Sequence, residues 1–132
     1  SFLPIREATI NIDRALALFP ELSARLNIPA DALSGGQKQM VLIGQAIIAN
    51  PQFLLIDELS LGLAPTVVNR LADTLEQLAR DGTGIVLIEQ FTTLALRLAN
   101  RAYVFERGRI VFDGTSSELS ENPGILHSAY LG

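Results

Sequence analysis

The chain has 132 residues, a formal net charge of −4, no cysteines, 48% hydrophobic residues and 18% charged residues. This composition excludes a disordered chain, disulfides and thiolate metal sites, and its acidic balance argues against nucleic acid as the main partner. No apolar run reaches the roughly 18 residues that suggest a membrane span, so we expect a small α/β protein that meets a membrane only through a partner.

The first predicted elements are helices. Residues 7–19 are predicted to form a helix that Pro20 stops, and a short second helix is predicted over residues 21–26. Ser34 is predicted to cap a longer helix that ends before residues 50–51. The apolar residues expected on one face of the first helix are Ala8, Ile12, Ala15, Leu16 and Phe19.

Strands and helices alternate after this point. The predicted elements are a buried strand over 53–56, a helix from Pro65 to about Arg80, a second buried strand over 85–88, a helix over 92–99, a hairpin of 103–105 with 110–112, and a last helix over 123–131. Strand, helix, strand, helix, strand is the pattern of an α/β fold with a right-handed, mainly parallel sheet and flanking helices.

The segment Leu33–Gln37 reads Leu-Ser-Gly-Gly-Gln and opens the predicted long helix. Two glycines at a helix N-terminus let a phosphate approach backbone N–H groups that the helix leaves unpaired, and the Ser34 hydroxyl adds a donor. Taken alone, the same residues also describe an ordinary helix cap.

Asp57 and Glu58 follow the first predicted strand directly. The carboxyl end of a buried strand is where α/β proteins bind ligands. There, one carboxylate can hold Mg²⁺ and the other can orient or deprotonate a water. A strand that ends in a solvated acidic turn is the alternative for this pair alone, but the two motifs in this order favour a nucleotide site.

The chain resembles the ATP-binding subunits of ABC transporters. Leu33–Gln37 resembles the ABC signature, and residues 53–58 resemble a Walker B strand with the catalytic glutamate. Residues 60–65, Gln90 and residues 129–132 resemble the subgroup that serves branched-chain amino acid importers. The resemblance implies a partial P-loop NTPase fold, in which residues 1–50 belong to the helical subdomain and residues 51–132 to the RecA-like ATPase core.

The resemblance also implies a role for each matching residue. Ser34, Gly35, Gly36 and Gln37 would contact the γ-phosphate of ATP held by a second ATP-binding subunit. Asp57 would help to bind Mg²⁺, Glu58 would act as general base or position the water, and Gln90 would contact the γ-phosphate. Two positions depart from the family pattern: Leu59 replaces a proline, and Ala64 replaces an aspartate of the D-loop.

By the same resemblance, the partners are a second ATP-binding subunit, the transmembrane permease subunits and, indirectly, a substrate-binding protein, with no nucleic acid. The expected place is the cytoplasmic face of the inner or plasma membrane, as a peripheral subunit. The implied activity is ATP hydrolysis that energises uptake of branched-chain amino acids or related substrates.

No G-x-x-x-x-G-K-[ST] sequence occurs in the 132 residues. The family pattern places this phosphate-binding loop, the P-loop, before residue 1, so binding of ATP and Mg²⁺ requires it and we expect negligible ATPase activity from these residues alone. The strand over 85–88 would then expose an unpaired edge, and we expect oligomerisation or rearrangement to cover it. Two alternatives stay open: a non-enzymatic dimerisation module, and a soluble ABC ATPase without a transport role.

Overall fold

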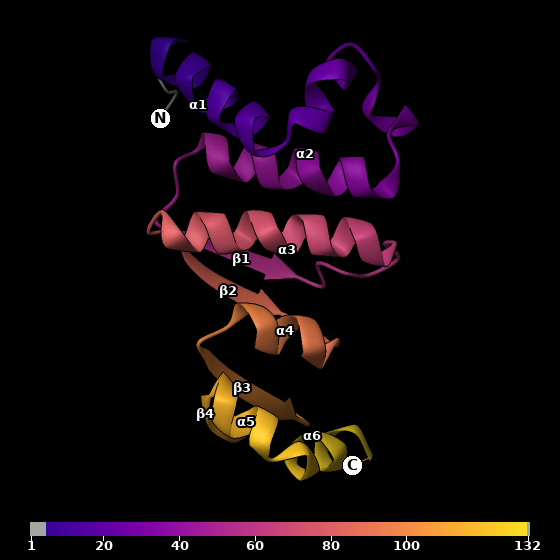
Figure 1. Ribbon diagram of the computed structural model, residues 1–132, viewed down its shortest axis with the longest axis vertical. Coiled ribbons are helices and arrows are strands. Elements are labelled where there is room, and N and C mark those ends of the chain that lie inside the picture. The colour runs from indigo at the N-terminus through magenta and orange to yellow at the C-terminus, as the bar shows by residue number, and fades with distance from the viewer. Residues whose placement is uncertain (1–4, 132) are drawn as a thin grey trace. The chain divides into compact units, whose positions relative to one another are not determined.

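A computed structural model describes residues 5–131 of the chain (Figure 1). The chain divides into two compact units, Ser1–Ile88 and Glu89–Gly132, and each unit is described by itself. The predicted boundary at residue 50 is of another kind, because it separates the helical subdomain from the RecA-like core and not two compact units. It stays a prediction.

Two helices, α1 (Ile5–Leu18) and α2 (Gly35–Ile48), lie side by side in the first unit, and the 3-10 turns η1 (Pro20–Arg25) and η2 (Ala30–Ala32) connect them (Figure 1). Gly44 of α2 faces Ala15, because a Cβ at Gly44 would lie 3.7 Å from the Ala15 Cβ. The Asn11 amide donates to the Ile48 carbonyl at 2.8 Å and so satisfies an acceptor in the last turn of α2.

The two predicted helices at the start of the chain are confirmed with small changes. The second is a 3-10 helix with Pro20 in its first turn, where a missing N–H costs nothing. Of the residues predicted to share one apolar face, Ala15 and Phe19 are buried, whereas 44% of Ile12 is exposed. Ala8 lies among the residues whose side chains are not described.

A strand–helix–strand unit follows: β1 (Phe53–Asp57), α3 (Pro65–Arg80) and β2 (Gly84–Ile88). The two strands pair in parallel, and a connecting helix is what a parallel pair requires. Leu54 and Ile56 are buried on one face of β1, and α3 supplies a matching buried face of Leu71, Ala72, Leu75 and Leu78. Burial of these aliphatic side chains forms the core that holds the carboxyl end of β1 in place.

The other face of the strand pair is exposed. Its side chains are Phe53 and Leu55 of β1 and Val86 and Ile88 of β2, with 71% of Leu55 exposed. The sequence predicts buried strands, but the side chains on this face of the pair are exposed. Among the described residues β1 and β2 form a sheet of two strands. From the sequence we expect oligomerisation or rearrangement to cover the unpaired edge of the strand over residues 85–88, and this stays a prediction.

The second unit holds α4 (Thr92–Leu98), β3 (Arg101–Glu106), β4 (Arg109–Thr115), α5 (Ser116–Glu121) and α6 (Pro123–Leu131). β3 and β4 pair antiparallel, which confirms the predicted hairpin. Its turn places Gly108 at a φ of 78°, the left-handed region that glycine adopts without strain. Opposite the turn, Arg101 forms an ion pair with Asp113 at 2.7 Å.

Helix α5 is absent from the sequence prediction although its signal is present. Thr115 and Glu118 form a capping box: the Glu118 N–H donates to the Thr115 hydroxyl at 3.2 Å, and the Thr115 N–H donates to the Glu118 carboxylate at 2.7 Å. The bond from the Thr115 N–H to the carboxylate, together with one that the Thr115 hydroxyl donates to it at 2.9 Å, lowers the pKa of Glu118 below its usual value. Thr-x-x-Glu is the sequence pattern of a helix start.

The predicted α/β fold class is confirmed, since strands and helices alternate along the chain, β1 and β2 pair in parallel, and α3 covers one face of the pair. In the described part of the chain, no helix is both long enough and apolar enough to cross a bilayer.

Candidate functional site

The signature segment, Leu33–Gln37, forms the start of α2. Ser34 is the N-cap, and its hydroxyl oxygen accepts from the Gln37 N–H at 3.3 Å while the Gln37 side-chain oxygen accepts from the Ser34 N–H at 3.1 Å. Such a reciprocal capping box fixes the first turn of the helix. Leu33 is buried beneath it, and the Lys38 ammonium donates to the Asp31 carbonyl at 3.2 Å.

The two glycines of the signature segment have different surroundings. Gly35 is exposed, and a Cβ placed on it would meet only the Leu63 side chain, at 3.4 Å. Gly36 is buried, and a Cβ there would lie 2.6 Å from a methyl group of Val67 in α3. Gly36 is therefore required for close packing of α2 on α3. The exposed face of the first turn is formed by Ser34 and Gly35.

The acidic pair, Asp57 and Glu58, stands at the carboxyl end of β1, and both residues are exposed. The Glu58 N–H donates to the Ile88 carbonyl at 2.8 Å, which continues the ladder of the strand pair past the end of β1. Glu58 has a φ of 50°, a left-handed conformation that costs a non-glycine residue of order 1–3 kcal/mol. Asn50 and Arg107 share this conformation, and of these three residues Glu58 alone belongs to the acidic pair at the end of a strand.

A turn over residues 58–64 links the acidic pair to α3. The Leu61 N–H donates to the Glu58 carbonyl at 3.2 Å, and Gly62 has a φ of 71°. Ala64 is the N-cap of α3 and makes no side-chain capping bond, so the first N–H groups of this helix have no side-chain cap. Leu59, only 1% exposed, anchors the turn in the core.

Leu59→Ala is expected to destabilise the chain by about 2–5 kcal/mol, because it empties a fully buried site. Leu61→Ala is the matched control: 68% of Leu61 is exposed in the same turn, and its loss should change stability by less than about 0.5 kcal/mol. Urea unfolding of the two variants measures the difference. Equal midpoints would show that Leu59 does not hold the turn.

Gln90 lies in the second unit, in the segment between β2 and α4, and is exposed. Beside it, the Glu89 carboxylate accepts from the Phe91 N–H at 3.3 Å, which closes a short turn.

In the first unit, the signature segment lies against Leu63 and Val67, in the part of the chain that follows the acidic pair. The structure thus joins the two predicted motifs through α3.

The polar groups of these two motifs suit the phosphate and the Mg²⁺ that the sequence implies. The first turn of α2 offers backbone N–H groups without intrahelical acceptors, and the Ser34 hydroxyl, which accepts a bond, keeps its proton for an anion. Mg²⁺ usually takes one or two carboxylates together with phosphates and waters, which suits the exposed Asp57. No cluster of three or more His, Cys, Asp or Glu side chains that could enclose a metal occurs within the described residues.

Sequence reasoning missed Val67 and noted Leu59 only as a departure from the family pattern, although both residues position these motifs. Both are ordinary apolar residues, and their roles come from partners distant in sequence.

A family model described as ABC transporter matches residues 7–60, a range that includes the signature segment and the acidic pair.

Two curated relatives are similar to most of the chain. It is 46% identical over 123 residues to the high-affinity branched-chain amino acid transport ATP-binding protein BraG of Pseudomonas aeruginosa, an alignment that covers 93% of this chain and 52% of BraG. It is 36% identical over 117 residues to the probable branched-chain amino acid transport ATP-binding protein LivF of Archaeoglobus fulgidus, with 88% of this chain and 50% of LivF covered. The chain spans about half the length of these relatives.

The fold is similar to a solved structure as well. The ADP conformation of MJ1267, an ATP-binding cassette of an ABC transporter, matches with a TM-score of 0.83 and 25% identity, covering 100% of this chain and 53% of that chain. The sequence motifs, the relatives and this fold agree: the chain belongs to the ATP-binding proteins of ABC transporters and carries part of their cassette fold.

Proposed function

We propose that the chain is part of the ATP-hydrolysing subunit of an ABC importer for branched-chain amino acids or related substrates. The observation that carries this proposal is the 46% identity to BraG over 93% of the chain, together with a capped signature helix that packs on the helix following an acidic pair. The subdomain division at residue 50 and the peripheral place on the cytoplasmic face of the membrane are parts of the same proposal.

The signature segment supplies the phosphate contacts. The exposed Ser34 hydroxyl and the N–H groups of Gly35 and Gly36, backed by the dipole of α2, bind the γ-phosphate of ATP held by a second ATP-binding subunit. Gln37 acts mainly by fixing the cap, because its side-chain oxygen already accepts from the Ser34 N–H.

The acidic pair supplies the chemistry. Asp57 binds Mg²⁺, which neutralises charge on the transferred phosphoryl group when it is present. Glu58 accepts a proton from the attacking water or orients it. Gln90 donates an amide N–H to the γ-phosphate, and this contact does not titrate near neutral pH.

Each signature completes the site of the other subunit, so the two subunits act as a head-to-tail dimer on permease subunits.

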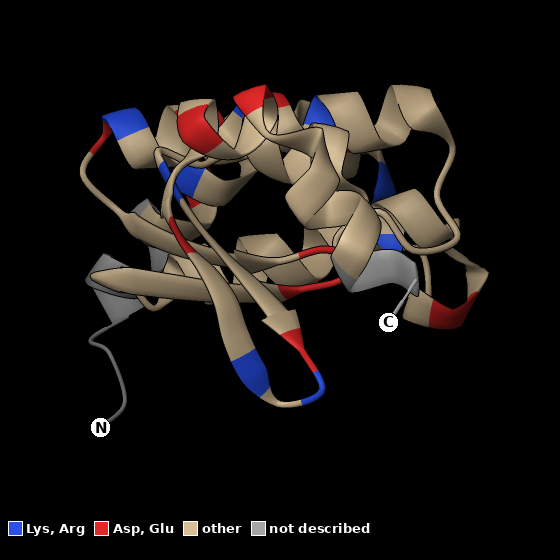
Figure 2. Cartoon of the chain, turned by 90° about the horizontal axis from the view of Figure 1, so that it is seen from below, with Lys and Arg blue, Asp and Glu red and all other residues tan. Residues whose placement is uncertain are grey.

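Nucleic acid is not among the proposed partners. Figure 2 shows acidic and basic residues interspersed along the described chain, with no run of basic residues along a helix, and phosphate backbones need clustered Lys and Arg.

A second candidate is a non-enzymatic module that keeps only the contacts to a partner cassette and to a permease. The absence of a P-loop sequence favours this candidate only for the 132 residues taken by themselves. In that case the Ser34 face still docks on a partner, but no water is activated at Glu58.

Titration with MgATP separates the two candidates. The 132-residue chain is compared with a completed cassette, in which a P-loop-bearing segment of a relative precedes residue 1. The proposal expects no measurable binding by the chain and micromolar to millimolar affinity with turnover by the completed cassette. Binding without turnover in the completed cassette would favour the non-enzymatic module, and the absence of binding would contradict the proposed function.

A further inference from the structure

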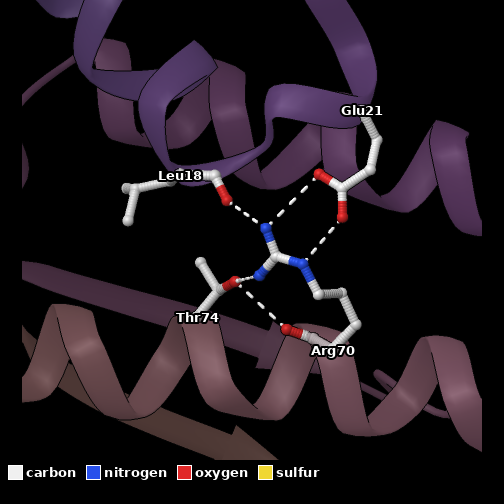
Figure 3. Close-up of polar contacts among 4 residues, drawn as sticks. All are labelled: Leu18, Glu21, Arg70 and Thr74. Carbon is white, nitrogen blue, oxygen red and sulfur yellow. Dashed lines mark hydrogen bonds and ion pairs between the residues drawn. The ribbon is translucent and has the colours of Figure 1, made fainter.

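Arg70 of α3 joins three groups that belong to different elements of the first unit (Figure 3). Its guanidinium donates to the Glu21 carboxylate of η1 at 2.7 Å and 3.3 Å, and to the carbonyl of Leu18 at the end of α1. A further N–H donates to the Thr74 hydroxyl at 2.6 Å, which ties the side chain back to α3. The guanidinium also lies over the Phe19 ring, 5.6 Å from its centroid.

The contact is matched in chemistry as well as in geometry. Two parallel N–H bonds to a carboxylate require the planar fork of arginine. The hydrogen bond and charge of Arg70 lower the pKa of Glu21 below its usual value, so the carboxylate stays ionised to a lower pH than an unpaired one. The Leu18 carbonyl lies in the last turn of α1, where it lacks an intrahelical donor. Arg70 therefore serves as the cap of α1.

Besides Arg70, Val67 also joins α3 to the group formed by α1, η1 and α2, since it fills the space beside Gly36 of α2. Val67 and Arg70 are three residues apart and so project from nearly the same face of α3. A single apolar contact acts as a pivot, whereas two contacts along one helix also fix the rotation of the group.

We propose that Arg70 is a positioning residue that fixes the orientation of the signature segment relative to the acidic pair. The acidic pair leads directly into α3 through the turn anchored by Leu59, and the signature segment is the start of α2. Arg70 links α3 to the group formed by α1, η1 and α2 at a point one helical turn beyond the contact of Val67 with Gly36. The importance of this orientation for ATP turnover rests on the proposed function, but the positioning itself does not.

The test measures orientation within the folded 132-residue chain, without nucleotide. Because the chain has no cysteine, spin labels can be placed at Gln45→Cys on α2 and Ala79→Cys on α3, both exposed positions. Double electron–electron resonance then reports the distribution of distances between the two helices. Circular dichroism and urea unfolding establish that each variant is folded under the conditions of the measurement.

Arg70→Met is expected to broaden and shift this distribution, and Arg70→Lys is expected to do so to a smaller extent, since an ammonium cannot make the paired bonds to Glu21. Arg80→Met is the matched control: Arg80 lies on the same helix and pairs with Glu76 at 3.8 Å, but only within α3. Its distribution should equal that of the parent chain.

An unchanged distribution in folded Arg70→Met, or an equal broadening in Arg80→Met, would overturn the positioning role. If Arg70→Met does not fold, Glu21→Gln in the same labelled chain is compared with the parent chain instead, because it removes the charge with which Arg70 forms its ion pair. Failure of the proposed function would appear in the MgATP titration and would leave this result unaffected.

Discussion

Glu58→Gln is expected to lower the rate of MgATP hydrolysis by the completed cassette about 10²- to 10⁴-fold while MgATP still binds. Glutamine has nearly the same size as glutamate and can orient a water, but it cannot take up a proton. The exposed carboxylate at the end of β1 leaves room for the water and the phosphate. Steady-state phosphate release, with a separate binding titration, measures the two parts of the prediction.

The matched control for this variant is Glu121→Gln, which changes an exposed carboxylate of the second unit and should leave turnover unchanged. A further variant, Glu58→Gly, separates chemistry from folding. Since glycine adopts the φ of 50° at this position without strain, Glu58→Gly should abolish turnover without lowering stability. Full turnover in Glu58→Gln would remove Glu58 from the catalytic role.

Gly36→Ala is expected to destabilise the chain by about 1–3 kcal/mol, because the new methyl group meets a methyl group of Val67 at 2.6 Å. Valine is branched at Cβ and holds one rotamer in a helix, so it cannot turn away at low cost. The start of α2 would have to move, and with it the exposed face formed by Ser34 and Gly35. Urea unfolding measures the loss of stability.

Two companion variants make this prediction specific. Gly35→Ala places its methyl group 3.4 Å from Leu63 at an exposed position and should be neutral or slightly stabilising, since alanine is the better helix former. Val67→Ala in the Gly36→Ala background should restore part of the lost stability by making room for the methyl group. Equal effects of the two glycine substitutions would show that Gly36 is not required for packing on α3.

The elements that the sequence predicts well are those with local signals. Ser34 with Gln37 forms the predicted cap, Pro65 opens α3 where expected, and Gly108 sits in the predicted hairpin turn. Each of these depends on residues within one turn of the position concerned. Helix α5 carried such a signal in Thr115 and Glu118 and could have been predicted.

The features that could not be predicted depend on contacts distant in sequence. Arg70 and Glu21 are surface charges by composition, and only the fold brings them to 2.7 Å. The left-handed backbone at Glu58 has no local signal, because residues of this type rarely adopt it. Likewise, nothing in the sequence of β1 distinguishes the buried Leu54 from the exposed Leu55.

The central claim is that the signature segment binds phosphate held by another subunit. Backbone amide signals of Gly35 and Gly36, followed by NMR in the 132-residue chain, test it most directly when a completed cassette and MgATP are added. The claim predicts that both amides shift and exchange more slowly only when the added cassette has an intact P-loop. Unchanged Gly35 and Gly36 amides, with MgATP bound to that cassette and the two polypeptides associated, would contradict it.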